Sequence, residues 1–368
     1  MRQYRAFTPE LTMLPHARQE FLLRQLALHG SVRAAEVAES MGVSAVTVRR
    51  DIAELADQGQ LERVHGGALS TGNTAGRPGA ARTLIGAVVP SRTFYYPEVL
   101  QGMESVAAPM HARIVLGVAG YSTEAVHSRV DRLLSLGVKG LVLTTSHLQS
   151  PEETAPWLAS LPVPVVLLER HNDATREARE IDSIRTDHSY GAMLAVDHFA
   201  ELGHSKVALA VDMWTPTAPW IRAGYLKAIE QLGLDTVPIT DLPSDVNNMQ
   251  EVSEAAEVLL DACLAADVHA VLAHSDHHAI QIAEIAQLRG LRIPEDLAVI
   301  SYDDVLVAHA AVPLTAVTPP RLELGREALR MLMGRLDGAD EPNPPRHVQL
   351  LPRLTIRESC GGSVHHGQ

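Results

Sequence analysis

Hydrophobic and polar residues follow two different patterns along this chain, one on each side of a short polar segment at residues 71–82. Before the segment, apolar residues such as Phe21, Leu22 and Leu26 recur at the spacing of a helix with one buried face. After it, short apolar runs alternate with amphipathic stretches of helical length. The pattern predicts a helical N-terminal domain followed by a larger α/β domain.

Three helices are predicted in the N-terminal domain. The first begins near Pro15 and ends at Gly30, and the second runs from about Ala34 to Met41. The third begins after Ser44, whose hydroxyl is suited to cap it. Two helices joined at a glycine turn indicate a helix-turn-helix.

The third helix is expected to bury one face and expose the other. Val48, Ile52 and Leu55 recur at spacings of four and three, so they face the core. Arg50 then points nearly opposite, with Arg49 beside it. The exposed face therefore carries two cationic hydrogen-bond donors.

These donors suit the major groove of DNA. Arginine can bind guanine bidentately or hold a phosphate, and Thr47 can contact a phosphate or a thymine methyl group. The alternative is a solvated face on which Asp51 and Glu54 pair with the arginines. Periodicity alone leaves both interpretations open.

Two strings in this region resemble the DeoR-type bacterial regulators. One is Arg18-x-x-x-Leu22-x-x-x-Leu26 followed by Ser44-x-x-Thr47-Val48-Arg49-Arg50-Asp51-Ile52. The other, Gly-Gln-Leu-Glu-Arg-Val-His-Gly-Gly-Ala at residues 59–68, resembles the wing of that family. The resemblance implies a winged helix-turn-helix DNA-binding domain over residues 1–70. Its candidate DNA contacts are Ser44, Thr47, Arg49, Arg50, Arg63 and His65.

Charge is distributed unevenly between the two parts of the chain. The net charge is −13, yet residues 1–70 hold eight Arg, no Lys and eight Asp or Glu and are neutral. This balance excludes unspecific binding to polyanions through general basicity and places DNA contact at the N-terminal end. Residues 71–82, rich in Gly, Thr and Pro, are interpreted as a flexible linker.

Residues 83–357 are expected to form two lobes, each a doubly wound parallel sheet, and residues 358–368 a tail. The predicted strands are Leu84–Val89, Ile114–Val118, Gly140–Leu143, Val163–Leu168, Val207–Val211, Ala270–Ala273 and Leu297–Tyr302. Helices are expected in the second lobe near Gly191–Leu202, Ala223–Leu232, Val252–Leu264 and Ala279–Leu288. Ligands of open α/β sheets bind at the carboxyl ends of the strands, so two facing lobes predict an interlobe cleft.

Polar and aromatic residues that follow these strands are the candidates for ligand binding. They are Phe94, Tyr95, Tyr96, Glu169, Arg170, Asp276 and Asp303. Carboxylates and arginine offer paired hydrogen bonds to vicinal hydroxyls, and an aromatic face covers the C–H side of a sugar ring. The set suits a neutral polyol. The alternatives are that the aromatic residues pack on the lobe and that Glu169 and Arg170 form a surface ion pair.

Further strings resemble the LacI/GalR repressors, whose sensor domains are similar to periplasmic sugar-binding proteins. They are Asp187-His188-x-x-Gly191-Ala192, Asp197-His198-Phe199-x-x-Leu202-Gly203-His204, Ser275-Asp276, Leu291-x-Ile293-Pro294-x-Asp296-Leu297, Tyr302-Asp303-Asp304 and Pro313-Leu314-Thr315. The resemblance spans residues 83–356. It implies that Glu169, Asp276 and Asp303 line an effector cleft and that three crossings between the lobes form a hinge.

The chain departs from the LacI/GalR pattern in three places, one of which is Pro319, where that family commonly has a polar residue before the next proline. Ile221 stands where that family usually has an arginine, and Arg222 follows one position later as a candidate sugar contact. Trp214 and Trp220 lie nearby and offer stacking faces instead. The minor-groove hinge helix of that family has no counterpart in residues 71–82, so DNA contact is expected from the DeoR-type head alone.

Enzymatic and metal-binding functions find little support in the sequence. It contains no Gly-x-x-x-x-Gly-Lys-[Ser/Thr] loop, no Gly-x-Ser-x-Gly elbow and no His-Glu-x-x-His helix, so we expect no enzyme activity, cofactor or metal. The histidines at 269, 274, 277 and 278 could suggest zinc, but a strand-to-helix turn separates them. The alternative is that they form a polar rim of the cleft.

Location and partners follow from what the chain lacks. No apolar secretory signal and no run of about 18 uncharged apolar residues occur, and Cys263 and Cys360 form no disulfide framework. We therefore expect a cytoplasmic protein with no membrane partner. One head reads few base pairs, so a homodimer on a symmetric or repeated operator is expected.

Three functions remain open at this point. The favoured one is a repressor of carbohydrate-utilisation genes that a neutral sugar releases from operator DNA. The second is a DeoR-like regulator that senses a phosphorylated sugar, and the third is a sugar-metabolising enzyme with a DNA-binding head. The acidic cleft candidates repel phosphate, which favours the first function over the second.

Overall fold

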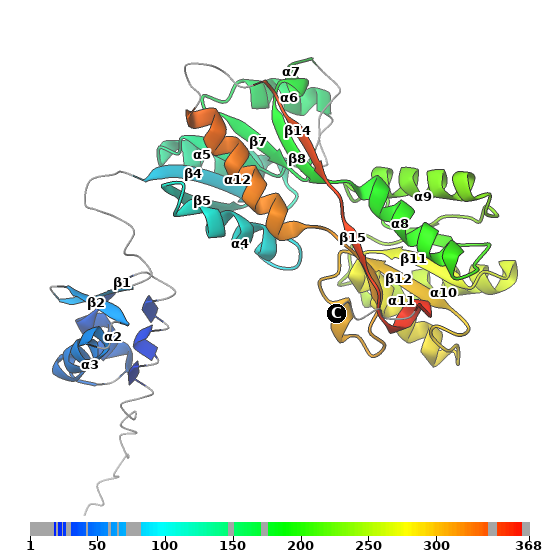
Figure 1. Cartoon of the computed structure of the whole chain (residues 1–368), viewed down its shortest axis with the longest axis horizontal. Helices are drawn as coiled ribbons and strands as arrows, with labels where there is room; N and C mark the ends of the chain where they lie inside the picture. Colours follow the sequence, from blue (N-terminus) through cyan, green and yellow to red (C-terminus); the bar gives the residue numbers. More distant parts are fainter. Residues whose placement is uncertain are drawn as a thin grey trace, which may run out of the picture. The chain divides into compact units, whose positions relative to one another are not determined.

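The computed structural model describes residues 18–19, 21–23, 25–26, 31–41, 43–57, 60–64, 66–70, 82–145, 151–170, 176–337 and 344–362. The chain divides into two compact units, residues 1–81 and 82–368, which we call the head and the sensor (Figure 1). Of the predicted linker, only Arg82 lies within the described residues.

The head combines a helix-turn-helix with a small antiparallel sheet. Residues 18–19, 21–23 and 25–26 are helical, and α2 (Ala34–Met41) and α3 (Ala45–Asp57) follow. The sheet has the order β1-β3-β2, with β1 at Ser31–Arg33, β2 at Leu61–Val64 and β3 at Gly67–Ser70. The predicted winged helix-turn-helix is confirmed. The sequence did not predict β1, which is too short to show an alternating pattern.

The core of the head is built from the predicted helical stripe. Leu22, Leu26, Val48, Ile52 and Leu55 are each 2% exposed or less. They pack in one cluster across the helices and against the sheet. The spacing of apolar residues therefore identified the buried face of α3 correctly.

A buried ion pair ties the first helical region to α3. Arg18 donates from Nε to Asp51 Oδ2 at 2.8 Å and from Nη2 to Asp51 Oδ1 at 2.9 Å. Asp51 is only 3% exposed. The alternative that Asp51 pairs with the exposed arginines of α3 is wrong, because its side chain points into the head and Arg18 occupies both carboxylate oxygens.

Lobe 1 of the sensor is a six-stranded parallel sheet of order β14-β8-β7-β6-β4-β5. Its strands are β4 (Thr83–Val89), β5 (Ala112–Val118), β6 (Gly140–Leu143), β7 (Val165–Leu168), β8 (Asp182–Thr186) and β14 (His347–Leu350). Its helices are α4 (Tyr96–Ala107), α5 (Thr123–Ser135), α6 (Pro151–Ala159), α7 (Arg176–Arg179) and α12 (Arg321–Asp337). One face packs against α4 and α12, which lie side by side in Figure 1, and the other against α5 and α6.

Lobe 2 has the sheet order β10-β9-β11-β12-β13-β15. Its strands are β9 (Ala208–Val211), β10 (Thr240–Asp241), β11 (Ala270–His274), β12 (Ala298–Tyr302), β13 (Thr315–Thr318) and β15 (Arg353–Thr355), the last of them antiparallel. Its helices are α8 (His188–Glu201), α9 (Ala218–Leu232), α10 (Met249–Ala266) and α11 (Asp276–Leu288), with short turns η2 (Val307–His309) and η3 (Glu358–Cys360).

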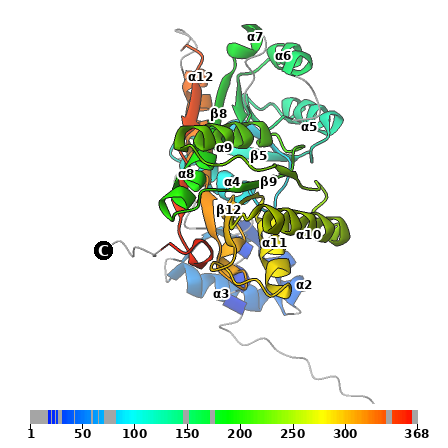
Figure 2. The ribbon, with the colours of Figure 1, turned by 90° about the vertical axis from the view of Figure 1, so that its right-hand side faces the viewer.

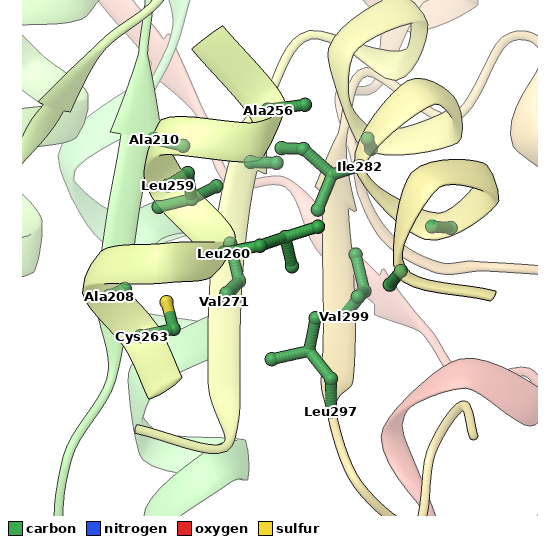
Figure 3. Close-up of a cluster of buried hydrophobic side chains, with 14 of the residues drawn as sticks. Ala208, Ala210, Ala256, Leu259, Leu260, Cys263, Val271, Ile282, Leu297 and Val299 are labelled. Atoms are coloured by element: carbon green, nitrogen blue, oxygen red, sulfur yellow. The ribbon is translucent and has the colours of Figure 1, made fainter. Parts of the chain in front are cut away.

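Two helix pairs cover the two faces of the lobe 2 sheet. Figure 2 shows α8 and α9 on one side of the sheet and α10 and α11 on the other. The pair α10 and α11 packs on the sheet through small and branched side chains, including Ala208, Leu260, Val271 and Val299 (Figure 3). Each predicted strand and helix of this lobe is confirmed, and the largest difference is at α9, which begins at Ala218 and not near Ala223.

The chain crosses between the two lobes three times, as the LacI/GalR resemblance implies. It leaves lobe 1 from β8 into α8, returns from β13 into α12, and leaves again from β14 into β15. Figure 1 shows β14 and β15 as one nearly continuous ribbon running through both lobes. The crossings hold the carboxyl ends of the two sheets opposite one another.

Several strands carry no apolar run and were not predicted, β8 among them. All five of its residues are buried, although its sequence is Asp-Ser-Ile-Arg-Thr. Asp182 is buried because it accepts hydrogen bonds from Arg335 Nε at 2.7 Å and Nη2 at 2.8 Å. Tertiary pairing of this kind leaves no hydrophobic pattern in the sequence.

The described part of the predicted tail belongs to the sensor. Within η3, Ser359 is fully buried and Cys360 is 2% exposed. Ser359 Oγ accepts from the Thr315 N–H at 2.8 Å, which fixes the turn beside β13. The sensor therefore extends past residue 357, where the sequence analysis ended it. In the described part of the chain, no helix has the length and apolarity needed to cross a membrane.

Candidate functional site

The exposed face of α3 carries most of the candidate DNA contacts. Ser44 caps the helix as predicted, since its Oγ accepts from the Thr47 N–H at 3.1 Å and lies 2.8 Å from Thr47 Oγ1. Arg49 and Arg50 are exposed, and Arg50 Nε donates to Glu54 Oε1 at 3.3 Å. Such an exposed pair contributes at most about 1 kcal/mol, so a phosphate or base can replace Glu54 as the partner of Arg50.

The wing adds one described cation to this surface. Arg63 is exposed on β2, whereas His65 lies outside the described residues. Gly66 joins β2 to β3 with a φ of 85°, a left-handed conformation that glycine adopts without strain. The head thus presents arginines from both α3 and the wing.

A cavity of about 750 Å³ lies between the two lobes of the sensor. Its walls are mainly loops and helix starts that follow β4, β5, β7, β8, β9, β10, β11 and β12, as the rule for carboxyl strand ends predicts. The volume falls in the range of small-molecule sites. Among the predicted ligand contacts, the structure brings together Phe94, Tyr95, Tyr96, Glu169, Arg170 and Asp303 in its lining.

Glu169 is the centre of a buried hydrogen-bond network in this wall. Its Oε1 accepts from Tyr95 OH at 2.6 Å and from Thr186 Oγ1 at 2.7 Å, and its Oε2 lies 3.1 Å from His188 Nε2. Burial by itself raises the pKa of Glu169, but His188 and these hydrogen bonds outweigh it and lower the pKa to about 2. The ionised carboxylate therefore fixes Tyr95 and His188 in place. The alternative of a surface ion pair between Glu169 and Arg170 is wrong, because both residues are buried and the carboxylate of Glu169 binds Tyr95, Thr186 and His188.

Three residues of the lining have left-handed backbone conformations. The φ angles are 61° for Phe94, 52° for Glu169 and 102° for Asp303. Such conformations are uncommon for residues other than glycine and persist where the surrounding structure compensates for their cost. They turn the chain sharply at the strand ends and place these side chains at the cavity.

Some polar atoms on the lining residues have no hydrogen-bond partner within the described residues. Arg170 donates from Nε to Thr145 O at 3.0 Å and from Nη1 to Glu169 O at 2.6 Å, which leaves Nη2 unpaired. His274 Nδ1 is also unpaired, and its Nε2 lies 4.0 Å from Asp303 Oδ2. Burial lowers the pKa of His274 to about 3, so the ring is neutral. Unpaired buried groups of this kind gain free energy when a polar ligand binds them.

The carboxyl group of Asp303 should make stability depend on pH. Burial, followed by the charge of Asp276, raises the pKa of Asp303 to about 8, against an ordinary value of 3.8. Between these pH values the folded protein binds more protons at Asp303 than the unfolded chain, so this residue's contribution to the free energy of unfolding falls as pH rises.

Asp303→Asn removes this titration. We expect the free energy of unfolding of the wild type, minus that of the variant, to decrease from about pH 5 to about pH 8 in denaturant titrations. A difference that stays constant over this range would mean that Asp303 is already ionised in the folded protein.

Asp276 does not line the cavity, which corrects the sequence prediction. It is fully buried, and its Oδ1 accepts from Ser301 Oγ at 2.6 Å and from the Asp304 N–H at 3.2 Å. Its Oδ2 accepts from the N–H groups of Val305 at 2.6 Å and Leu306 at 2.8 Å. Asp276 therefore holds the loop after β12, which forms part of the cavity wall.

Two further candidates, Trp220 and Arg222, also lie outside the lining. The Trp220 ring is nearly parallel to the His188 ring, with 6.1 Å between the centroids. The Arg185 guanidinium lies over the Trp220 ring, 4.4 Å from its centroid. Ile221 is fully buried, so the next residue, Arg222, is carried to the exposed face of α9. Trp220 therefore stacks on His188 without lining the cavity itself, and Arg222 is exposed to solvent.

The lining also contains residues that the sequence analysis left out of its candidates. Tyr121 follows β5 and Asp212 follows β9, and both belong to the cavity wall. The rule that selected Phe94 and Glu169, a polar or aromatic residue after a predicted strand, could have found them. Trp214, considered only as a stacking face, lines the cavity as well.

The histidines at the end of β11 and in the first turn of α11 form part of this wall. His274, His277 and His278 line the cavity, and His277 packs against Phe94 with ring centroids 5.0 Å apart. Over the described residues, no group of three or more His, Cys, Asp or Glu side chains is arranged to hold a metal ion. The position of these three histidines in the cavity wall agrees with a polar rim of the cleft, which was the alternative to a zinc site.

A DNA-binding head joined to a two-lobed sensor defines the class of transcription regulators with a periplasmic-binding-protein-like domain. Residues 18–74 match the DeoR-like helix-turn-helix domain, and residues 196–360 match the periplasmic binding protein-like domain. The HTH-type transcriptional regulator CelR of Thermobifida fusca is 30% identical over 296 residues, or 76% of this chain and 84% of CelR. The chain belongs to the LacI family of transcriptional regulators, and its head is DeoR-like.

Other relatives agree with this assignment. The HTH-type transcriptional repressor CytR of Escherichia coli (strain K12) is 27% identical over 246 residues, or 66% of this chain and 70% of CytR. A complex of CelR with cellobiose superposes with a TM-score of 0.65 at 23% identity, covering 86% of this chain and 91% of that one. A LacI family regulator from Enterococcus faecium with bound ribose superposes with a TM-score of 0.62 at 22% identity, covering 76% of this chain and 98% of that one. These two structures share the fold.

Proposed function

We propose that this protein is a repressor of carbohydrate-utilisation genes that binds operator DNA through its head and is released when a neutral sugar binds between the sensor lobes. The observation that carries the proposal is the interlobe cavity of about 750 Å³, lined by aromatic rings and by residues with unpaired polar atoms. Solved regulators of this fold include one with cellobiose and one with ribose. We extend sugar binding to this chain because its own cavity offers suitable groups.

The charge of the lining favours a neutral ligand. Among the described residues that line the cavity, Glu169, Asp212 and Asp303 are acidic and Arg170 is the only arginine or lysine. Two nitrogens of Arg170 already donate to backbone carbonyls. A phosphorylated sugar would meet more acidic than basic groups, whereas hydroxyls can both donate to carboxylates and accept from Arg170.

The proposal includes a homodimer in the cytoplasm and no enzymatic activity. A symmetric dimer would place two heads on a palindromic or repeated operator, which gives more specificity than one recognition helix. Closure of the cavity around a sugar would change how the two sensors of a dimer face one another. Sugar and operator are then linked only if the sugar binds the closed state more tightly than the DNA-competent state.

Operator titrations with and without sugar test the proposal. A sugar that raises the Tm in a thermal-shift screen should weaken operator binding by roughly 5- to 150-fold, which corresponds to a coupling of about 1–3 kcal/mol. The matched control is the phosphorylated form of the same sugar, which we expect to leave both Tm and operator affinity unchanged. Equal operator affinities with and without the stabilising sugar would refute release, and a response to the phosphorylated form alone would favour the second function.

A further inference from the structure

A second hollow adjoins the interlobe cavity on lobe 2. This groove has a volume of about 610 Å³ and lies between two segments, the one after β9 and the one at and after β10, and the first half of α10. Trp214 and Ser244 line both the cavity and the groove. The two hollows are therefore neighbours that share a wall.

Trp214 stands at this shared wall with an unusual degree of exposure. It is 70% exposed, although the chain has only three tryptophans and is 4% aromatic. What distinguishes Trp214 from other exposed apolar residues is that it lines two hollows, and ligand pockets are lined mainly by apolar and aromatic side chains. A flat indole face is suited to the C–H side of a sugar ring.

The loop that carries Trp214 is held by hydrogen bonds to one residue of the cavity lining and one residue of the groove lining. The Trp214 N–H donates to Asp212 Oδ1 at 2.9 Å, and Ser244 Oγ donates to the same oxygen at 2.8 Å. On the groove side, the Met213 N–H donates to Asp241 Oδ1 at 3.0 Å. Asp212 lines the cavity and Asp241 lines the groove, so the backbone of Trp214 is held at the boundary between them.

The groove offers polar acceptors around an apolar strip. Glu251 and Glu254 are exposed on α10 and line the groove together with Leu242, Ala255 and Val258. Carboxylates accept hydrogen bonds from hydroxyls, and the apolar strip can lie against C–H groups. The groove therefore repeats, at the surface, the combination of acceptors and apolar contacts found in the cavity.

We propose that the effector is an oligosaccharide, with one unit bound in the interlobe cavity and the following units lying across Trp214 into the groove beside α10. This inference rests on the proposed function, because it assumes that the cavity binds a sugar. It adds a distal subsite and assigns Trp214 as the residue that selects for chain length.

The experiment measures binding by the full-length protein to glucose-, galactose-, mannose- and xylose-based series of one to four units, using calorimetry. For the series that binds, affinity should rise from the single sugar to the trimer by roughly 2- to 12-fold for the aromatic contact. In Trp214→Ala, affinity for the trimer should fall by more than affinity for the single sugar, so that the advantage of length is lost. Trp214→Phe should restore part of it.

Two further variants separate the groove from the loop. Glu254→Gln changes a residue that lines only the groove and should weaken the trimer alone. Met213→Ala is the matched control, because Met213 neighbours Trp214 and is 38% exposed but lines neither hollow. It should leave the whole series unchanged.

The outcomes distinguish this inference from the proposed function. If a single sugar binds as tightly as its trimer and Trp214→Ala changes neither, the distal subsite is wrong and the proposed function stands. Equal weakening of single sugar and trimer would place Trp214 in the cavity subsite only and would also overturn the inference. If no member of any series binds, the proposed function fails and the inference fails with it.

Discussion

Replacing Asp276 by alanine should lower the free energy of unfolding of the sensor by about 3–5 kcal/mol, as the loss of several buried hydrogen bonds to one charged group implies. The carboxylate is fully buried and accepts four hydrogen bonds, three of them from consecutive N–H groups at Asp304, Val305 and Leu306. Alanine leaves these donors without their acceptor at a fully buried position. Denaturant unfolding of the full chain measures the loss.

Asp303→Asn provides the comparison, because Asp303 lines the same cavity wall but its carboxyl group makes no hydrogen bond within the described residues. We expect this variant to remain folded at neutral pH and to lose about 0.5–1.5 kcal/mol of sugar affinity if a hydroxyl binds the carboxyl group, which is largely protonated there because its pKa is about 8. The variants thus separate a residue that supports the wall from one that contacts the ligand. An Asp276→Ala protein with wild-type stability and no sugar binding would restore Asp276 as a ligand contact.

Replacing Arg50 by alanine should weaken operator binding by about 1–3 kcal/mol if the guanidinium contacts a base, with a change in sequence preference at that position. If it holds a phosphate instead, the salt dependence of binding should become shallower by about one unit. The reason is the placement of Arg50 on α3, where it is exposed beside Arg49 and, among the described residues, pairs with Glu54 at the surface. Operator titrations at several salt concentrations distinguish the two cases.

Arg113→Ala is a charge-matched control, since Arg113 is exposed on β5 of the sensor. It should leave operator affinity and its salt dependence unchanged. Glu54→Gln releases Arg50 from its surface partner and should leave binding unchanged or slightly tighter. Unchanged affinity and salt slope in both Arg49→Ala and Arg50→Ala would contradict a role of α3 in DNA binding.

The helices of the head could be predicted from the sequence because their signals are local. A helix shows its buried face within two or three turns, as Val48, Ile52 and Leu55 do, and Ser44 marks the start of α3 by a hydrogen bond to a residue three positions away. The partner of Asp51 could not be predicted in this way. Arg18 is 33 positions distant, and only packing of the first helical region on α3 brings the two together.

The same distinction applies to the strands of the sensor. Buried parallel strands made of Val, Leu and Ile, such as Gly140–Leu143, are visible as apolar runs. The polar strand β8 is equally buried, but its Asp182 carboxylate is paired with Arg335 of α12, which lies 153 positions further along the chain. No local pattern records such a partner.

At the site, local apolar runs are enough to show which residues follow strands, and the carboxyl-end rule then places six of these candidates at one cavity. The role of each side chain there depends on segments that are distant in the sequence. Glu169 follows β7 by one residue and Asp276 follows β11 by two, yet the loop after β12 donates to both carboxylate oxygens of Asp276. Arg222 and Trp220 lie close to the site in sequence, but the helical rotation of α9 turns them away from the lining. Position along the chain brings a residue to the edge of the sheet, and the packing of distant segments determines whether its side chain meets the ligand or the protein.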